Sequence, residues 1–209
     1  MTNLQRIFDQ NQAWSEAKVS DNPDYFADMA EGQSPEYLWL GCADSRVPAA
    51  RVTGLEPGEL FVHRNIANVI VHSDINSLSV IQYAVEVLKV KHVVVCGHYG
   101  CGGVKAAMEG EGNSLIFNWL RHINDVERFH ETELAKLSGE EKFNRLCELN
   151  VAEQALSVAN STPVQTVWAE GSDLEVHGII YDLKSGRLKD LGVNFTSATN
   201  PFRNTEMPN

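Results

Sequence analysis

The chain has 209 residues, of which 43% are hydrophobic and 22% charged, as is ordinary for a globular protein with one substantial core. Its formal net charge of −11 argues against a nucleic-acid partner, because phosphate recognition needs clustered Lys and Arg side chains. No apolar run approaches the length of a membrane-spanning helix, so we expect no membrane partner. Four cysteines without a framework spacing favour a reducing compartment, and residues 1–12 have no apolar signal-peptide core. We therefore expect a cytoplasmic location.

The first 34 residues have the periodicity of helices. Apolar residues recur at helical spacing as far as Ala17, and the segment 20–23 then ends this pattern with signals for a second helix. Because these helices precede the first strand, we expect residues 1–34 to form an N-terminal helical arm that packs on a neighbouring subunit.

Short apolar runs alternate with helical patterns in the next part of the chain. Buried strands are predicted over 37–40, 59–62 and 92–96, and the segment 76–88 has helical period with a cap residue at its start. Strands separated by helices indicate parallel pairing with right-handed crossovers. We expect an α/β fold with a central, mostly parallel sheet flanked by helices.

The pattern of the remaining chain predicts helices and then a hairpin. Residues 114–159 have helical period with a break at 138–139, and 174–193 alternate like two strands joined by a turn at 184–186. The acidic runs 109–111 and 139–141 are interpreted as solvated loops, and the polar tail 200–209 is expected to fray. The whole of 1–209 is predicted to be a single domain.

Two short segments place metal-binding side chains directly after predicted strands. Cys42 and Asp44 are two apart in an extended segment and can face one site, while His98 and Cys101 are three apart across a turn that opens a helix. Both pairs follow strand ends, where open parallel sheets form their ligand sites. Because all four side chains are of types that bind zinc tetrahedrally, we predict one zinc ion per chain.

Arg46 bears on what such a zinc ion does. A complete shell of four protein ligands is typical of structural zinc, because catalytic zinc keeps one position for water. If Asp44 leaves the metal, one position opens, and Arg46 can hold the released carboxylate through a bidentate ion pair. The residues therefore leave two functions open: an enzyme whose site switches between closed and open, or a zinc-stapled binding or scaffold protein without turnover.

At these residues the chain resembles the β-class carbonic anhydrases. The resemblance covers roughly residues 14–193, and its motifs are Cys42-x-Asp44-x-Arg46, His98-x-x-Cys101, Val47-Pro48, Glu56-Pro57-Gly58-Glu59-Leu60-Phe61-Val62-His63-Arg64-Asn65 and Gly102-Gly103. It implies an α/β fold, assembly as homodimers or as pairs of dimers, and zinc-dependent reversible hydration of CO2 to bicarbonate and a proton. A close alternative is a hydrolase of the same fold that acts on another small linear molecule such as CS2.

The resemblance also implies roles for individual residues. Cys42, His98 and Cys101 are implied to be permanent zinc ligands. Asp44 is implied to be an exchangeable ligand that, once paired with Arg46, accepts a hydrogen bond from the attacking hydroxide and aims it at CO2. The implied substrate contacts are the Gly102 amide, the Gln33 side chain, which the partner subunit supplies in the family, and an apolar wall of Phe61, Ile66, Tyr83 and Val87.

One subgroup of this family, the bicarbonate-regulated type II enzymes of bacteria, has a second, non-catalytic bicarbonate site. Its signature is a Trp, an Arg and a Tyr, and Trp39, Arg64 and Tyr181 occupy the matching positions here. Arg64 would supply charge, while Trp39 and Tyr181 would donate hydrogen bonds to the anion. The resemblance thus implies allosteric control, with activity low near neutrality and rising above about pH 8.

The proton shuttle is not identifiable from the sequence, and Tyr99, His122 and His130 are candidates by residue type alone. Four other histidines are interpreted as structural, namely His63, His72, His92 and His177. Cys96 and Cys147 are interpreted as buried thiols.

Overall fold

The structure is a computed structural model in which residues 3–110, 112 and 114–199 are described. The predicted polar tail 200–209 lies outside the described residues. The chain divides into two compact units, Met1–Ser34 and Pro35–Asn209. In the first unit, α1 (Asn3–Asp21) and α2 (Tyr25–Ala30) contact each other through the rings of Trp14 and Phe26, so the helical arm has the predicted two helices.

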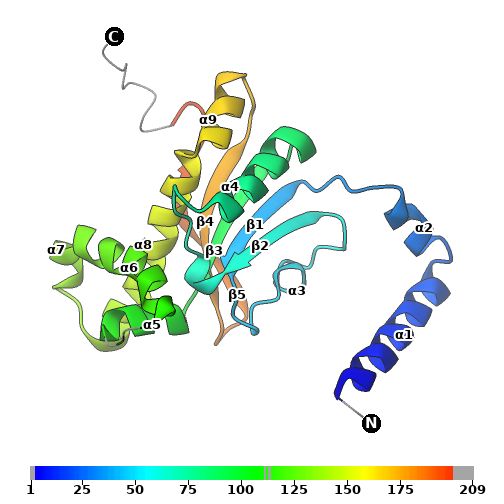
Figure 1. Cartoon of the computed structure of the whole chain (residues 1–209), viewed down its shortest axis with the longest axis horizontal. Helices are drawn as coiled ribbons and strands as arrows, with labels where there is room; N and C mark the ends of the chain where they lie inside the picture. The colour runs from blue at the N-terminus through cyan, green and yellow to red at the C-terminus, as the bar shows by residue number, and fades with distance from the viewer. Residues whose placement is uncertain (1–2, 111, 113, 200–209) are drawn as a thin grey trace. The chain divides into compact units, whose positions relative to one another are not determined.

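The second unit is built on a five-stranded sheet with the strand order β2-β1-β3-β4-β5 (Figure 1). The strands are β1 (Tyr37–Cys42), β2 (Leu60–Asn65), β3 (His92–His98), β4 (Glu175–Asp182) and β5 (Arg187–Phe195). The first four run parallel to one another, and β5 returns antiparallel to β4 as the predicted hairpin. The predicted α/β fold with a mostly parallel sheet is confirmed.

Helices connect the strands and cover the sheet. They are α3 (Ala49–Thr53), the 3-10 turn η1 (Ile66–Asn68), α4 (Ile75–Gln82), the π-helical turn η2 (Tyr83–Leu88), α5 (Gly102–Glu109), α6 (Leu115–Phe129), α7 (Glu131–Leu134), α8 (Gly139–Ala159) and α9 (Thr162–Ala169). Figure 1 shows α5, α6 and α7 gathered at one end of the sheet. No helix among the described residues is long and apolar enough to cross a membrane.

The two faces of the sheet are packed differently. On one face, alternate residues such as Leu38, Leu40 and Val95 are fully buried beneath α4, η2, α8 and α9. The helix α8 lies so close to this face that a Cβ added to Gly97 would stand 2.5 Å from a methyl carbon of Val151. On the other face, Trp39 belongs to a smaller apolar cluster with residues at and just before α3.

The structure corrects some predicted boundaries. β1 and β3 extend to Cys42 and His98, β2 begins at Leu60, and the predicted helix 76–88 changes from α to π hydrogen bonding at Tyr83. The interpretation of 139–141 as a loop is wrong, because these residues form the first turn of α8, where two glutamates interact favourably with the helix dipole.

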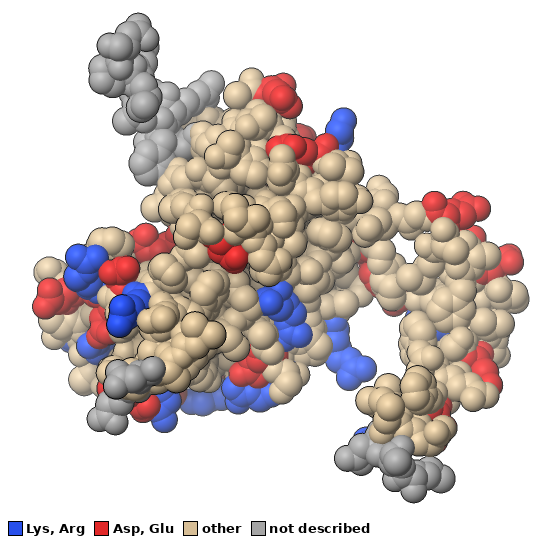
Figure 2. All heavy atoms as spheres, viewed as in Figure 1, with Lys and Arg blue, Asp and Glu red and all other residues tan. Residues whose placement is uncertain are grey.

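Strand ends are the part of the fold that matters for function. β1 pairs with β3 in parallel from Tyr37 opposite His92 to Gly41 opposite Cys96, so the two strands end at the same edge of the sheet. Cys42 and His98 are therefore brought together by strand register. In the view of Figure 2, acidic and basic side chains lie mainly toward the margins of this unit, and most of its centre is formed by other residues.

Candidate metal centre

Three predicted metal ligands converge at this edge of the sheet. Cys42 ends β1, His98 ends β3, and Cys101 lies in the turn immediately before α5. All three are buried, and their potential ligand atoms lie within 4.8 Å of one another. The sulfur atoms of Cys42 and Cys101 are 4.0 Å apart. Tetrahedral zinc with zinc–sulfur bonds of about 2.3 Å would separate them by about 3.8 Å, so the spacing fits the ion.

The His98 ring is oriented as a metal ligand. Its Nδ1 atom lies 3.0 Å from the carbonyl oxygen of Tyr99, so Nδ1 carries the hydrogen and donates it to that carbonyl. The opposite atom, Nε2, is buried and has no hydrogen-bond partner among the described residues. A buried nitrogen without a partner is costly unless a ligand occupies its lone pair. This atom faces the two cysteines, which supports a cation-binding role.

The two thiols ionise as a pair. The pKa of Cys42 is lowered, chiefly because the thiol of Cys101 donates a hydrogen bond to its thiolate, and the nearby His98 lowers it further. The pKa of Cys101 is raised, since ionising it would break that hydrogen bond in a buried site. One thiolate is therefore favoured even without a metal, and a divalent cation would favour both.

Asp44 lies beside the three ligands but is held by Arg46. Its Oδ1 accepts hydrogen bonds from the backbone nitrogen and Nε of Arg46, each at 2.9 Å, and its Oδ2 accepts one from Nη2 at 2.7 Å. This bidentate pair holds the pKa of the Asp44 carboxyl well below its usual range. The same Oδ2 is 3.7 Å from Nε2 of His98. The carboxylate thus stands next to the metal centre while bound to Arg46.

Arg64 holds the backbone of the segment Cys42–Asp44 by hydrogen bonds. Its Nε donates to the carbonyl of Cys42 at 2.8 Å, and its Nη2 donates to the carbonyl of Asp44 at 2.5 Å. Two donors of one guanidinium therefore fix the backbone on which both a metal ligand and the ion-paired carboxylate stand.

Comparison with known proteins identifies the family. Residues 37–188 match the family model described as carbonic anhydrase. A carbonic anhydrase of Emericella nidulans is 52% identical over 191 residues, which are 91% of this chain and 84% of the relative. Among solved structures, a tetrameric β-carbonic anhydrase of Sordaria macrospora has a TM-score of 0.89 and 39% identity, covering 94% of this chain and all of that one. The β-carbonic anhydrase CafA of Aspergillus fumigatus has a TM-score of 0.88 and 40% identity, covering 94% of each chain.

The chain belongs to the β-class carbonic anhydrase family. Its reaction is the hydration of CO2 to bicarbonate and a proton, and the Cys42, His98 and Cys101 cluster is consistent with the zinc site of a β-carbonic anhydrase.

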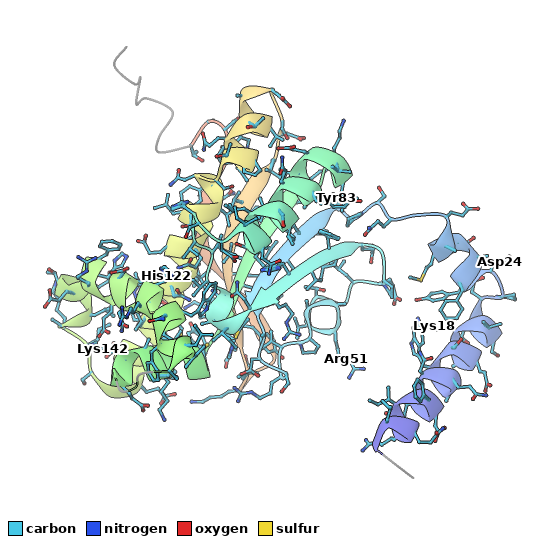
Figure 3. The ribbon with its side chains drawn as sticks, in the orientation of Figure 1. Lys18, Asp24, Arg51, Tyr83, His122 and Lys142 are labelled. Carbon is cyan, nitrogen blue, oxygen red and sulfur yellow. The ribbon has the colours of Figure 1, made fainter. Side chains whose placement is uncertain are left out.

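The residues implied as substrate contacts of this carbonic anhydrase are only partly gathered. The side chain of Ile66 lies next to Gly103, whose added Cβ would stand 3.1 Å from an Ile66 carbon. The rings of Phe61 and Tyr83 are 5.8 Å apart, and Tyr83 comes from the turn that continues α4 (Figure 3). Val87 is 60% exposed. Gly102 begins α5 directly after the ligand Cys101, whereas Gln33 belongs to the first compact unit.

The side chains of the three proton-shuttle candidates, Tyr99, His122 and His130, each contact another side chain. The Tyr99 hydroxyl donates to the carboxylate of Glu148 at 2.5 Å, and Nε2 of His130 lies 2.8 Å from an oxygen of Glu153. His122, labelled in Figure 3, comes from α6 and contacts the Trp119 ring edge to face. None of these side-chain contacts involves Cys42, His98 or Cys101, and Tyr99 meets His98 through its backbone carbonyl.

Sequence reasoning missed a pair of buried amides that support the segment after β2. The side chain of Asn150 donates to the carbonyl of Ala67 at 2.9 Å, and that of Gln154 accepts from the backbone nitrogen of Ile70 at 2.7 Å. The available signal was the spacing of two amides four residues apart on an otherwise apolar helix face. They fix a backbone in which Ala67 has a φ of 61°, next to Ile66.

Replacing Cys42 tests whether the cluster holds zinc. We expect Cys42→Ser to lower zinc affinity by at least about 10- to 100-fold. Loss of a residue that only supports a ligand already costs roughly that much, and this substitution removes a ligand sulfur itself. Bound zinc per chain, measured by atomic absorption after dialysis, provides the readout. Cys96→Ser is the matched control, since Cys96 is also buried but packs in the Trp39 cluster on the other face. Equal zinc content in the two variants would contradict the assignment.

Proposed function

We propose that this carbonic anhydrase is zinc-dependent, with Cys42, His98 and Cys101 as permanent ligands and Asp44 as an exchangeable one. The observation that carries the proposal is the buried Nε2 of His98, which faces two cysteine sulfurs and finds no hydrogen-bond partner in the described part of the chain. A carboxylate stands beside it, already paired with an arginine. This donor set suits zinc, since thiolate and imidazole are its usual ligands.

In this arrangement the protein's task is to position the reactants. When bound, zinc supplies a Lewis acid that lets a water molecule lose its proton near neutral pH. Arg46 fixes the Asp44 carboxylate, which accepts a hydrogen bond from the attacking oxygen and so directs its free lone pair toward CO2. The Gly102 amide, at the first position of α5, is free to donate to a substrate oxygen. The apolar side chains of Phe61, Ile66, Tyr83 and Val87 suit an uncharged substrate.

Asp44 can also close the site. In the structure its carboxylate is bound to Arg46, which leaves three protein ligands around the metal position. Its Oδ2 is only 3.7 Å from Nε2 of His98, so a small rotation would bring it into the fourth ligand position. Such a shell would have no place for water. We propose that exchange of Asp44 between Arg46 and the metal switches activity on and off.

Removing Arg46 should trap the closed arrangement. We expect Arg46→Ala to keep its zinc but to lower kcat for CO2 hydration by about 10- to 100-fold, the loss that corresponds to a hydrogen-bonded ion pair. Stopped-flow CO2 hydration and zinc analysis measure the two effects. Arg51→Ala is the matched control, because Arg51 is an exposed arginine on the nearby α3 (Figure 3).

Full activity in Arg46→Ala would contradict the switch. A second check is the pH profile of the unaltered enzyme, whose rate should rise between about pH 6 and pH 9 because hydroxide competes with the Asp44 carboxylate for one position. A flat profile over that range would also rule the switch out.

We further propose a regulatory bicarbonate site at Trp39, Arg64 and Tyr181. The indole Nε1 of Trp39 is a buried donor with no partner among the described residues. Tyr181 packs against the same apolar cluster as Trp39. Arg64 supplies positive charge and also holds the carbonyls of Cys42 and Asp44, so an anion that draws on Arg64 would disturb the segment carrying the switch. This link gives bicarbonate a physical route to Asp44.

Trp39→Phe tests this site without altering Arg64, whose replacement would also release two carbonyls of the metal segment. We expect inhibition by bicarbonate to weaken about tenfold, since a donor to an anion is lost. Zinc content and activity without added bicarbonate should not change. Trp168→Phe is the control, because the Trp168 indole donates to the carbonyl of Leu174. Unchanged inhibition in Trp39→Phe would refute the site.

Self-association is the last part of the proposal. The Sordaria macrospora relative is a tetramer, and this chain leaves apolar side chains of α1 uncovered, with Ile7 and Phe8 each 59% exposed. The strand β2 pairs only with β1 in the described sheet, so its other edge is free for contact. We propose a homodimer or homotetramer in which the partner subunit covers the apolar wall and supplies its Gln33.

Light scattering tests the assembly. We expect a mass of two or four times the 23.2 kDa of one chain, and a lower mass for Phe8→Asp, because a charge is then buried in the interface. Gln10→Asp, which adds a charge elsewhere on α1, should leave the mass unchanged. A wild-type mass equal to that of one chain would overturn this part of the proposal.

A further inference from the structure

A second group of potential metal ligands lies at the opposite edge of the sheet. His92 begins β3, Glu175 begins β4, and His177 is two residues further along β4. The parallel register places His92 directly opposite Glu175, and the period of two puts His177 on the same face as Glu175. Strand pairing thus brings two imidazoles and one carboxylate to a single place, which we name the His92 cluster.

Distances within the His92 cluster fit a tetrahedral metal. Nδ1 of His92 and Nε2 of His177 are 3.1 Å apart. The Oε2 atom of Glu175 lies 3.4 Å from Nε2 of His177 and 3.8 Å from Nδ1 of His92. Metal–ligand bonds of about 2.0–2.2 Å at tetrahedral angles separate neighbouring ligand atoms by about 3.3–3.6 Å. The three observed separations lie close to this range, so little movement would be needed to bind an ion.

The cluster is also held and accessible. The Tyr37 ring stacks on His92 with a centroid distance of 5.3 Å and an interplanar angle of 21°, which fixes that imidazole. The three side chains are each between 26% and 38% exposed, so solvent and ions reach them. Without a metal, the two histidines share one hydrogen in their contact. A cation would take the lone pairs of both nitrogens, with each ring keeping its hydrogen on the other nitrogen.

We propose that His92, Glu175 and His177 form a second divalent-metal site, distinct from the catalytic centre. Two imidazoles and one carboxylate suit zinc, and also cobalt, nickel and copper, which prefer the same ligand types. Three protein ligands leave a fourth position for water. The ion would join β3 to β4 at the amino end of the strands.

This site shares no residue with the catalytic centre. His92 and His98 are the two ends of β3, a strand of 7 residues, so the sites are separated by about 20 Å. Occupancy of one can therefore be changed without removing a ligand of the other. We expect the second ion to stabilise the fold, because a ligand that binds only the folded chain shifts the unfolding equilibrium.

Zinc titration of the zinc-loaded enzyme tests the proposal. Added ZnCl2, followed by equilibrium dialysis and metal analysis, should show a second equivalent per chain in the wild type and raise its thermal midpoint. His177→Gln should weaken this second binding by at least about tenfold, as should Glu175→Gln, which keeps the size of the side chain. His72→Gln is the control, since His72 contacts Ser157 and lies outside the cluster. Basal CO2 hydration should be the same in all three variants.

Two results would overturn the proposal. One is the absence of a second equivalent in the wild type at zinc concentrations up to about 100 μM, because a site that stays empty there has a Kd above that concentration. The other is a second equivalent that persists unchanged in both His177→Gln and Glu175→Gln, because zinc would then bind elsewhere. Cys42→Ser separates the two sites, as it should lose the first equivalent and keep the second.

Discussion

The ion pair between Asp44 and Arg46 is the interaction on which the catalytic proposal depends. Both carboxylate oxygens accept hydrogen bonds from one guanidinium, and one of them also accepts from the Arg46 backbone. While the pair holds, three buried side chains face the metal position, and a fourth place is free. If it breaks, the same carboxylate is near enough to fill that place. In the proposed switch, this one ion pair separates a catalytic shell from a closed one.

Neighbouring hydrogen bonds fix the backbone and the ring that surround this pair. Arg64 fixes the carbonyl of Asp44 and that of Cys42, so the backbone between the ligand and the carboxylate has little freedom to move. On the other strand, the carbonyl of Tyr99 holds the His98 ring with its free nitrogen toward the cysteines. A change at Arg64 would alter the backbone of Cys42 and Asp44 through these hydrogen bonds. The proposed regulation therefore needs no large conformational change.

The two edges of the parallel sheet offer metals different environments. At the carboxyl end, the ligands are buried and include two thiols, whose mutual hydrogen bond already favours a thiolate. At the amino end, the His92 cluster is partly exposed and has only imidazole and carboxylate ligands. Thiolates favour zinc over harder cations, whereas the second set accepts several transition metals. The same strand, β3, begins at one cluster and ends at the other.

The sequence by itself determined the sheet, most of the helices and the four candidate ligands. These features depend on hydrophobic period and strand-end motifs, which involve only residues close together along the chain. Sequence reasoning failed where the decisive contact joins distant segments. The acidic run 139–141 looked like a loop but begins α8, and α9 was not predicted. His92 and His177 were interpreted as structural histidines and not as partners, since they are 85 positions apart and only the register of β3 and β4 makes them neighbours. Likewise, the sequence indicated Arg46 as a possible partner of Asp44. Only the tertiary structure shows that Arg64 holds the carbonyls of Cys42 and Asp44 and that the His98 ring lies beside the Asp44 carboxylate. Such contacts depend on how strands align in space, and spacing along the chain does not encode that alignment.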